Sequence, residues 1–309
     1  MVLLANGVAG AGVGPSAERL AARQPGLDAL VEGVSAVERD LAVHSVGLGG
    51  WPNLLGELEL DAAVMDGDTR RTGAVGALRG VVSACRVALH VLRDLDHEIL
   101  VGAGAARFAA EIGVVGAAGE DGLTPEARAV WWRRLSASMT EDQRAAFPDT
   151  SLLPLTGALA EPDSVRDTTV FLCRDANAGL HAATSTSGWA WKYPGRLGDA
   201  PIAGAGFYAD SRFGAAACTH TGEMAIRAGT ARTIVLALRL GKTLREAVDL
   251  AVEELVELET GCLGPLVIHA LDARGGHRVV ALRCSEPVFF WYWREGMAAP
   301  ERREAEAVG

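Results

Sequence analysis

Three threonines mark the ends of predicted strands in the second half of the chain. Thr168 opens a short apolar run that ends at Cys173, Thr186 lies near the end of the run 180–187, and Thr219 ends the run 213–219. Short apolar runs rich in β-branched and aromatic residues, bounded by polar or glycine-containing turns, predict strands. Each strand therefore presents a hydroxyl at its end, and a hydroxyl becomes an effective nucleophile when a base lies within reach.

An arginine and an aspartate lie between the second and the third of these strands. Arg196 and Asp199 belong to the segment GRLGDAPI, and a glycine-rich loop follows at 204–206. A planar guanidinium can offer two parallel hydrogen bonds to a carboxylate. A single strand-end threonine is ordinarily structural, and a single Arg–Asp pair is ordinarily solvated surface. Only their combination, in this order and at this spacing, favours a catalytic site.

The order of five motifs gives this region a family resemblance. The chain resembles the N-terminal-nucleophile hydrolases of the glycosylasparaginase and isoaspartyl-peptidase/asparaginase family, and its upstream stretches are more similar to the glycosylasparaginase branch. The similarity covers most of the chain, up to about residue 295. The motifs are DT followed by an apolar strand, TSTSG, GRLGDAPI, GAGFYAD and THTGE, and the upstream stretches are 45–67, 73–79 and 100–109.

The resemblance implies that the chain cuts itself between Asp167 and Thr168. Residues 1–167 would become an α subunit and residues 168–309 a β subunit, with Thr168 as the new N-terminus. A threonine hydroxyl is a poor nucleophile at neutral pH, but an α-amino group with a pKa of about 7.7 to 8 is a base within reach of its own Oγ1. Neither a metal nor an organic cofactor is expected.

The resemblance also assigns substrate contacts. Thr186 matches a threonine that hydrogen-bonds the nucleophile, and Thr219 with the backbone N–H of His220 matches an oxyanion hole. The remaining matches are Arg196 for a substrate α-carboxylate, and Asp199 with the Gly222 carbonyl for its α-ammonium. The implied substrate is a small molecule with a β-aspartyl amide, and its leaving group is left open: a sugar amine, an amino acid, ammonia or part of a specialised metabolite.

The chain departs from the family pattern at several of these places. Arg166 stands where a histidine is usual before the Asp-Thr pair, and Val170 where a glycine is usual two residues after the threonine. His220 stands where the oxyanion donor is usually a glycine. Near the N-terminus, Asn6 and Gly7 replace a Thr-Trp pair whose tryptophan walls the substrate site. The first three departures bear on the rate of cleavage and turnover, and the last predicts a more open pocket.

The element order predicts an α+β fold. Strands, helices, strands, helices and strands follow one another, which suits two stacked sheets between helical layers. The resemblance implies the same four-layer αββα sandwich of the N-terminal-nucleophile hydrolase type, with residues 1–309 as a single hydrolase domain. It further implies a homodimer of such α/β heterodimers.

Composition narrows the class of partner. The net charge of −10 and pI near 5.2 argue against nucleic acid or an anionic membrane surface, and no apolar run approaches the length of a membrane span. The five scattered cysteines show no metal-binding spacing, and they predict free thiols in a reducing, cytoplasmic setting. The glycine-rich opening lacks the basic region of a signal peptide and predicts a first core strand followed by a tight connection.

The rest of the chain predicts mostly packing elements. The aromatic run 288–293 is interpreted as sheet core or subunit interface, and the last residues as a frayed end. The other expected elements are helices over 27–40, 75–92, 105–111, 123–135, 223–240 and 243–260, a strand over 58–65, a hairpin of 266–271 with 278–283, and an exposed loop over 141–167.

Two other functions stay open. A non-catalytic family member would keep the fold and the motifs while Gly7, Val170 and His220 abolish turnover. A nucleotide-binding oxidoreductase would use the glycine-rich stretches near Gly10 and Gly102, although the first lacks the GxGxxG spacing. Flavin or nicotinamide absorbance would distinguish the second, and an uncut, inactive but folded chain would favour the first.

Overall fold

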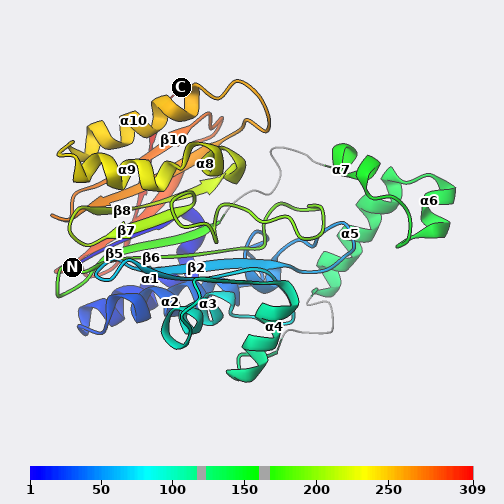
Figure 1. Ribbon diagram of the computed structural model, residues 1–309, viewed down its shortest axis with the longest axis horizontal. Helices are drawn as coiled ribbons and strands as arrows, with labels where there is room; N and C mark the ends of the chain where they lie inside the picture. Colours follow the sequence, from blue (N-terminus) through cyan, green and yellow to red (C-terminus); the bar gives the residue numbers. More distant parts are fainter. Residues whose placement is uncertain (117–122, 160–167, 309) are drawn as a thin grey trace.

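Two sheets and the helices on their outer faces make up an α+β protein (Figure 1). The structure is a computed structural model that describes residues 1–116, 123–159 and 168–308. No helix within these residues is long and apolar enough to span a bilayer.

The larger sheet has eight strands in the order β12-β11-β1-β5-β6-β2-β3-β4. Its central strands are almost completely buried, as expected for a sheet covered on both faces. Every pairing is antiparallel except that of β3 with β4. The strands are β1 Val2–Asn6, β2 Leu60–Asp66, β3 Arg71–Leu78, β4 Ile99–Val101, β5 Thr169–Arg174, β6 Leu180–Thr186, β11 Phe289–Arg294 and β12 Glu301–Glu304.

The smaller sheet has five strands in the order β13-β10-β9-β8-β7. Alanines fill much of the face that meets the larger sheet, and side chains this small let two layers of backbone approach closely. This packing brings the ends of β5, β6 and β8 to one edge. The strands are β7 Phe207–Asp210, β8 Gly214–His220, β9 Leu266–Asp272, β10 His277–Leu282 and β13 Glu306–Val308.

Helices cover the outer faces of both sheets. The first four pack on the larger sheet and the last three on the smaller one, each group around its own apolar cluster (Figure 1). The close contact of the first two helices depends on glycine, because a Cβ on Gly12 would lie 2.1 Å from the Gly33 carbonyl oxygen. These helices are α1 Gly10–Ala21, α2 Gly26–Glu38, α3 Ala84–Asp94, α4 Gly102–Glu111, α8 Gly222–Ala228, α9 Thr230–Arg239 and α10 Leu244–Val256, with 3₁₀ turns at Gly7–Ala9 and Gly47–Gly49.

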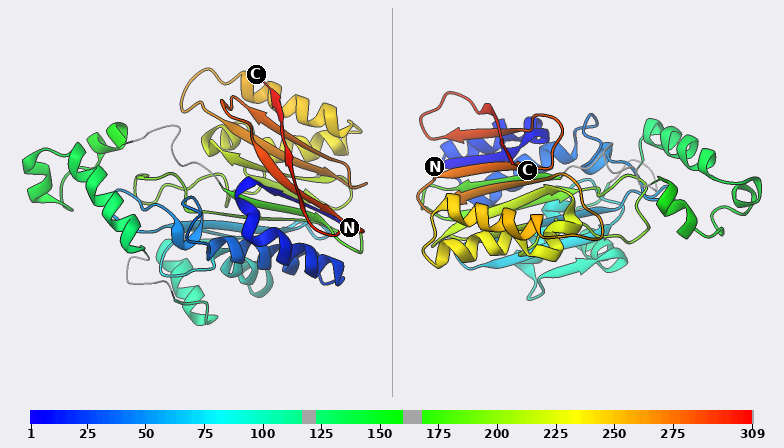
Figure 2. Two further views of the ribbon diagram at one scale, coloured as in Figure 1. Left: turned by 180° about the vertical axis from the view of Figure 1, so that it is seen from behind. Right: turned by 90° about the horizontal axis from the view of Figure 1, so that it is seen from above.

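Three further helices form an arm that extends from one side of the sheets in both views of Figure 2. Its side chains pack on Leu54 and Trp191, and Trp131 Nε1 donates a hydrogen bond to the Leu54 carbonyl at 3.3 Å. The arm therefore rests on the loop before β2, which contains Leu54, and on the loop after β6, which contains Trp191. Its helices are α5 Pro125–Ser138, α6 Glu141–Ala146 and α7 Leu153–Leu159.

The structure confirms the first core strand, the capping box of Thr243 with Glu246, the hairpin of β9 and β10, and the aromatic run as sheet core. Residues 75–92 are not one helix: the apolar spacing also fits a strand, and β3 pairs with β2 along its length before α3 begins. Residues 223–240 are two helices, because Gly229 adopts φ +57° between them.

Three further expectations were wrong. The glycine-rich opening is not merely a connection, since α1 begins at Gly10. Within 141–159, the expected loop contains α6 and α7, and α6 begins with a capping box of Thr140 and Gln143. The C-terminal residues are not frayed, because β12 pairs with β11 and β13 pairs with β10.

Candidate active site

Thr168 lies directly before β5, where it is only 5% exposed. Asn6, at the end of β1, holds the backbone around it: Nδ2 donates to the Thr168 carbonyl at 2.6 Å, and Oδ1 accepts from the Val170 N–H at 3.1 Å. The side chain that differs from the family pattern thus positions the candidate nucleophile. Asp167 and Arg166 lie outside the described residues.

One small cavity brings five predicted site residues together. Its volume is about 10 Å³, which leaves room for roughly one water molecule. Gly188, Trp189 and Gly198 complete its lining. The predicted residues that line it are Thr168, Thr186, Arg196, Asp199 and His220.

Arg196 is paired with a carboxylate that the sequence analysis did not single out. Glu223 Oε1 accepts hydrogen bonds from Arg196 Nε at 3.1 Å and Nη2 at 2.8 Å, and the guanidinium stacks over the Trp189 ring at 4.5 Å. Within the described residues, Glu223 Oε2 is buried without a hydrogen-bond partner. The guanidinium therefore already binds one carboxylate oxygen from inside the protein.

Asp199 is buried, and within the described residues its Oδ2 has no hydrogen-bond partner. Burial raises its pKa to about 7, an increase that the Arg196 charge opposes only in part. Gly222 lies against it, since a Cβ there would be 2.4 Å from Asp199 Oδ1. The structure thus brings Asp199 and Gly222 together, and only glycine fits beside this carboxylate.

Two acidic residues before and at the start of β2 hold the loop that carries Arg196 and Asp199. Asp61 accepts from the Gly198 N–H at 3.1 Å, and Glu59 accepts from the Gly195 N–H at 3.0 Å. Glu59 also lies 3.8 Å from the ammonium of Lys192, whose pKa is lowered by burial. In the sequence, these two carboxylates interrupt the otherwise apolar stretch LELDAAVM, and a charged residue within a buried strand indicates a specific partner.

The end of β8 has an unusual backbone. His220 adopts φ +81°, a conformation that favours glycine, and Thr219 Oγ1 lies 2.8 Å from His220 Nδ1. The family glycine at this position therefore has a structural reason here as well. Thr186, at the end of β6, donates to the Ser45 carbonyl at 3.2 Å and accepts from the Gly188 N–H at 2.9 Å.

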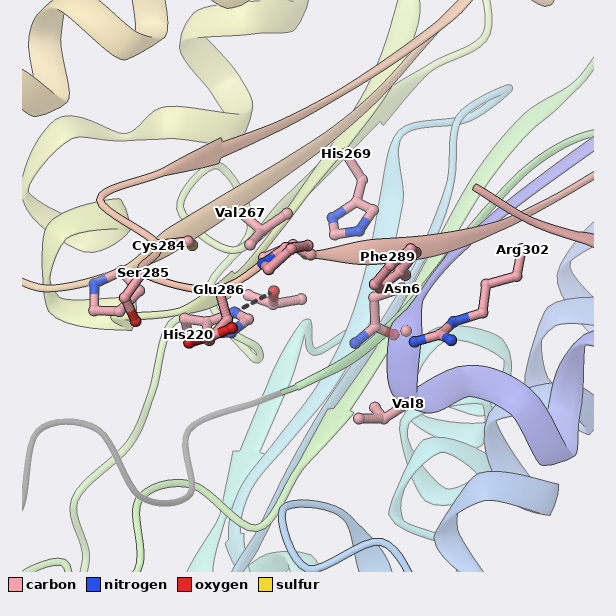
Figure 3. Close-up of a pocket in the computed structure, with 15 residues that line it drawn as sticks. Asn6, Val8, His220, Val267, His269, Cys284, Ser285, Glu286, Phe289 and Arg302 are labelled. Carbon is pink, nitrogen blue, oxygen red and sulfur yellow. Dashed lines mark hydrogen bonds between the residues drawn. The ribbon is translucent and has the colours of Figure 1, made fainter. Parts of the chain in front are cut away.

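A second and larger pocket, of about 540 Å³, also has His220 in its lining (Figure 3). Thr219 lines this pocket and not the small cavity, whereas His220 lines both. Gly7 leaves it open, and a Cβ there would be 2.9 Å from the Phe289 carbonyl oxygen. The pocket is therefore continuous with the place where the family tryptophan is absent.

One group of metal-ligating side chains exists within the described residues: Asp66, Asp68 and His181. It lies at the other end of the β2–β6 pair, because Asp66 pairs with His181 whereas Asp61 pairs with Thr186. None of its members lines the small cavity. All five cysteines are free thiols, three of them buried.

The fold and the cavity define a class: an α+β protein in which a buried threonine lines a small cavity together with an arginine and an aspartate. A family model described as asparaginase matches residues 12–301. The chain belongs to this asparaginase family of N-terminal-nucleophile hydrolases, which confirms the resemblance read from the motifs.

Several curated proteins are similar to the chain. A putative N(4)-(beta-N-acetylglucosaminyl)-L-asparaginase of Drosophila persimilis is 38% identical over 74% of this chain and 63% of its own length. A protein of the same name in Drosophila melanogaster is 34% identical over 90% of this chain and 74% of its own. An isoaspartyl peptidase/L-asparaginase of Danio rerio is 33% identical over 78% and 72%. The chain thus spans less than two thirds of the first of these relatives.

Proposed function

We propose that the chain is a self-processing amide hydrolase that cleaves the side-chain amide of an asparagine or β-aspartyl compound. The observation that supports this best is the small cavity, where Thr168 meets Arg196 and Asp199. The names of the relatives, glycosylasparaginase-like and isoaspartyl peptidase/L-asparaginase, describe the same kind of amide.

Self-processing begins at Thr168. Its Oγ1 attacks the carbonyl carbon of Asp167, the acyl group moves from nitrogen to oxygen, and water hydrolyses the resulting ester. Thr168 then carries a free α-amino group, which accepts the hydroxyl proton when the same Oγ1 attacks a substrate amide. The leaving amine takes that proton, and water releases the aspartyl product. No metal or organic cofactor takes part.

The other residues hold the substrate. Arg196 binds its α-carboxylate in place of Glu223, so substrate entry opens the Arg196–Glu223 pair and widens the cavity. Asp199 and the Gly222 carbonyl bind the α-ammonium. Thr219 and the backbone N–H of His220 stabilise the tetrahedral oxyanion, and preorganised donors of this kind contribute a large share of catalysis.

Thr186 completes this set of roles by orienting the nucleophile. We further propose that the fold is a four-layer αββα sandwich of the N-terminal-nucleophile hydrolase type. The two subunits 1–167 and 168–309 would remain one domain after cleavage, and two such heterodimers would pair.

Intact mass spectrometry of the purified protein tests the proposal. We expect two chains whose masses sum to the 32.2 kDa precursor plus one water, with Thr168 at the new N-terminus. Thr168→Ala should leave one uncut and inactive chain. Thr169→Ala removes the neighbouring buried hydroxyl and should still be cut. A cut at another bond, or full activity with the bond intact, would refute the proposal.

A non-catalytic family member is the second candidate. Two features favour it. Glu223 occupies the guanidinium of Arg196 that would bind the α-carboxylate, and His220, the proposed oxyanion donor, has a strained backbone with a positive φ. An uncut chain that binds aspartate but hydrolyses no member of a β-aspartyl amide panel would establish this alternative.

A further inference from the structure

The larger pocket contains an arginine that the proposed function leaves unused. Arg302, on β12, lines the pocket and places its guanidinium 4.0 Å from the centre of the Phe289 ring. Within the described residues, its guanidinium makes neither an ion pair nor a hydrogen bond. The adjacent Arg303, in contrast, pairs with Glu301 at 2.8 Å. Arg302 is therefore a cation that is available to a ligand.

A buried histidine in the same pocket also lacks partners. His269, on β9, is 1% exposed, and neither ring nitrogen has a hydrogen-bond partner within the described residues. The Ala217 backbone is close enough to favour the charged ring slightly but does not make a bond of good geometry. Burial lowers the pKa of His269 to about 3, so the ring is neutral. The neutral ring carries one donor and one acceptor, but both nitrogens are shielded from solvent, so the ring contributes to the wall of the pocket.

The position of the pocket fits the departing half of the substrate. His220 lines both hollows, so a group bound beyond the oxyanion donors lies on the side of the scissile bond opposite the aspartyl half. Gly7 lines the larger pocket without a side chain, and a Cβ there would lie 2.9 Å from the Phe289 carbonyl oxygen, so a larger residue would not fit without movement of β11.

The charges of the pocket are separated. In Figure 3, Glu286 lies at the His220 end, and Arg302 lies at the end of Asn6 and Phe289. A carboxylate on a ligand is repelled from the first end and attracted to the second. The Arg302 guanidinium also covers one face of the Phe289 ring, so a sugar cannot stack on that face.

Building on the proposed function, we propose that this pocket binds the leaving half of the substrate and that Arg302 selects leaving amines that carry a carboxylate. The preferred substrates are then β-aspartyl compounds of an α-amino acid, not asparagine linked to a neutral sugar. Arg302 pairs with the carboxylate of the leaving amino acid.

Three substrates measure this selection: β-aspartyl-leucine, β-aspartyl-leucinamide, and N-acetylglucosaminyl-asparagine. The first two differ only in the carboxylate. For the wild-type protein we expect kcat/KM to be about three- to fivefold higher for the acid than for the amide, the upper range for an ion pair at an exposed site. Arg302→Gln should remove this preference by lowering kcat/KM for the acid alone. Arg303→Gln, one residue along the same strand, should keep it.

A binding measurement separates this inference from the proposed function. Calorimetric titration of leucine and leucinamide needs no turnover, and Arg302 should make leucine the tighter ligand. If no amide is hydrolysed but leucine still binds through Arg302, the proposed function falls and the pocket assignment stands. Hydrolysis without preference for the acid, an equal loss on both peptides in Arg302→Gln, or better turnover of the sugar compound would overturn the inference.

Discussion

Two arginines of the site differ in what already surrounds them. Arg196 is paired with Glu223, stacked on Trp189 and lines a cavity of about 10 Å³. Arg302 contacts the Phe289 ring in a pocket of about 540 Å³ and is exposed to solvent. The first region has preset geometry and little space, whereas the second has space and an unused charge.

This difference separates two tasks of one site. Opening the partly buried Arg196–Glu223 pair costs free energy, because each partner then loses its compensating charge. An exposed cation contributes less energy, but it can distinguish one ligand from another. The closed region is thus suited to the constant half of a substrate, and the open region to the half that varies between substrates.

The largest effect should come from Asp199→Asn. The folded-state pKa of Asp199 is raised to about 7, so the native protein binds the extra proton and loses stability as pH rises from about 4 to 7. Between pH 4 and pH 8, the free energy of unfolding of the variant should therefore increase relative to that of the wild type by the order of 2–4 kcal/mol. Denaturant unfolding at both pH values measures this change.

The same variant should change substrate binding. The proposed role of ionised Asp199 in holding the α-ammonium predicts that wild-type kcat/KM rises with pH through about 7, before a further rise from the Thr168 α-amino group at about 7.7 to 8. The variant should keep only the second rise. Glu38→Gln is the matched control, since burial also raises the pKa of Glu38 to about 7 outside the cavity. It should alter the pH dependence of stability only. If kcat/KM of Asp199→Asn still rose with pH near 7, that titration would belong to another group.

Arg196→Lys should weaken substrate binding by about 1–3 kcal/mol, because one ammonium cannot reproduce a two-pronged contact. Inhibition by aspartate gives the affinity directly. Arg302→Lys, which makes the same exchange in the open pocket, should have a smaller effect. Equal losses at the two positions would erase the distinction between the closed and open regions.

Gly222→Ala should lower kcat/KM about tenfold or more for substrates with an α-amine, since the new Cβ displaces the Asp199 carboxylate. Gly104→Ala makes the same chemical change where the added methyl group would have no atom within 4 Å, so activity should not change. Steady-state kinetics on one aspartyl amide compares the two. Normal activity of Gly222→Ala would place the α-ammonium elsewhere.

The smallest effect is expected for His220→Gly. A glycine adopts the positive φ of this position without strain, although it raises the entropy of the unfolded chain. We therefore expect thermal unfolding to show that His220→Gly is about 1 kcal/mol more stable than His220→Ala. Because the proposed oxyanion donor is the backbone N–H, turnover should persist in the glycine variant. Complete loss of turnover there would transfer the role to the imidazole.

The closed region could be predicted from sequence because its residues form local motifs. GRLGDAPI carries Arg196 and Asp199, and THTGE carries Thr219, His220 and Gly222, the glycine that makes room for Asp199. The Glu223 pairing was not predicted, since an acidic residue near a helix start has an ordinary capping role. The open pocket depends on Asn6, His269 and Arg302, which come from β1, β9 and β12 and share no sequence pattern.

The same reasoning explains the errors in the fold. Apolar spacing fits both a strand and a helix over 75–92, and only pairing with β2 decides between them. The charged C-terminal residues look solvated, but backbone hydrogen bonds to β10 and β11 order them whatever their side chains. The helix that begins after Thr243 could be predicted, because its capping box with Glu246 is a local pattern of four residues.

The order of strands in the larger sheet has a consequence for a severed chain. β1 lies between β5 and β11, so the segment before residue 168 is hydrogen-bonded on both sides by the segment after it. After cleavage, strands of the two pieces would alternate within one sheet. The pieces could separate only if the backbone hydrogen bonds of β1 to both β5 and β11 were broken. Once unfolded, the two pieces would have to meet again by diffusion, so the fraction refolded after heating would depend on protein concentration. The uncut chain folds in an intramolecular reaction and has no such dependence.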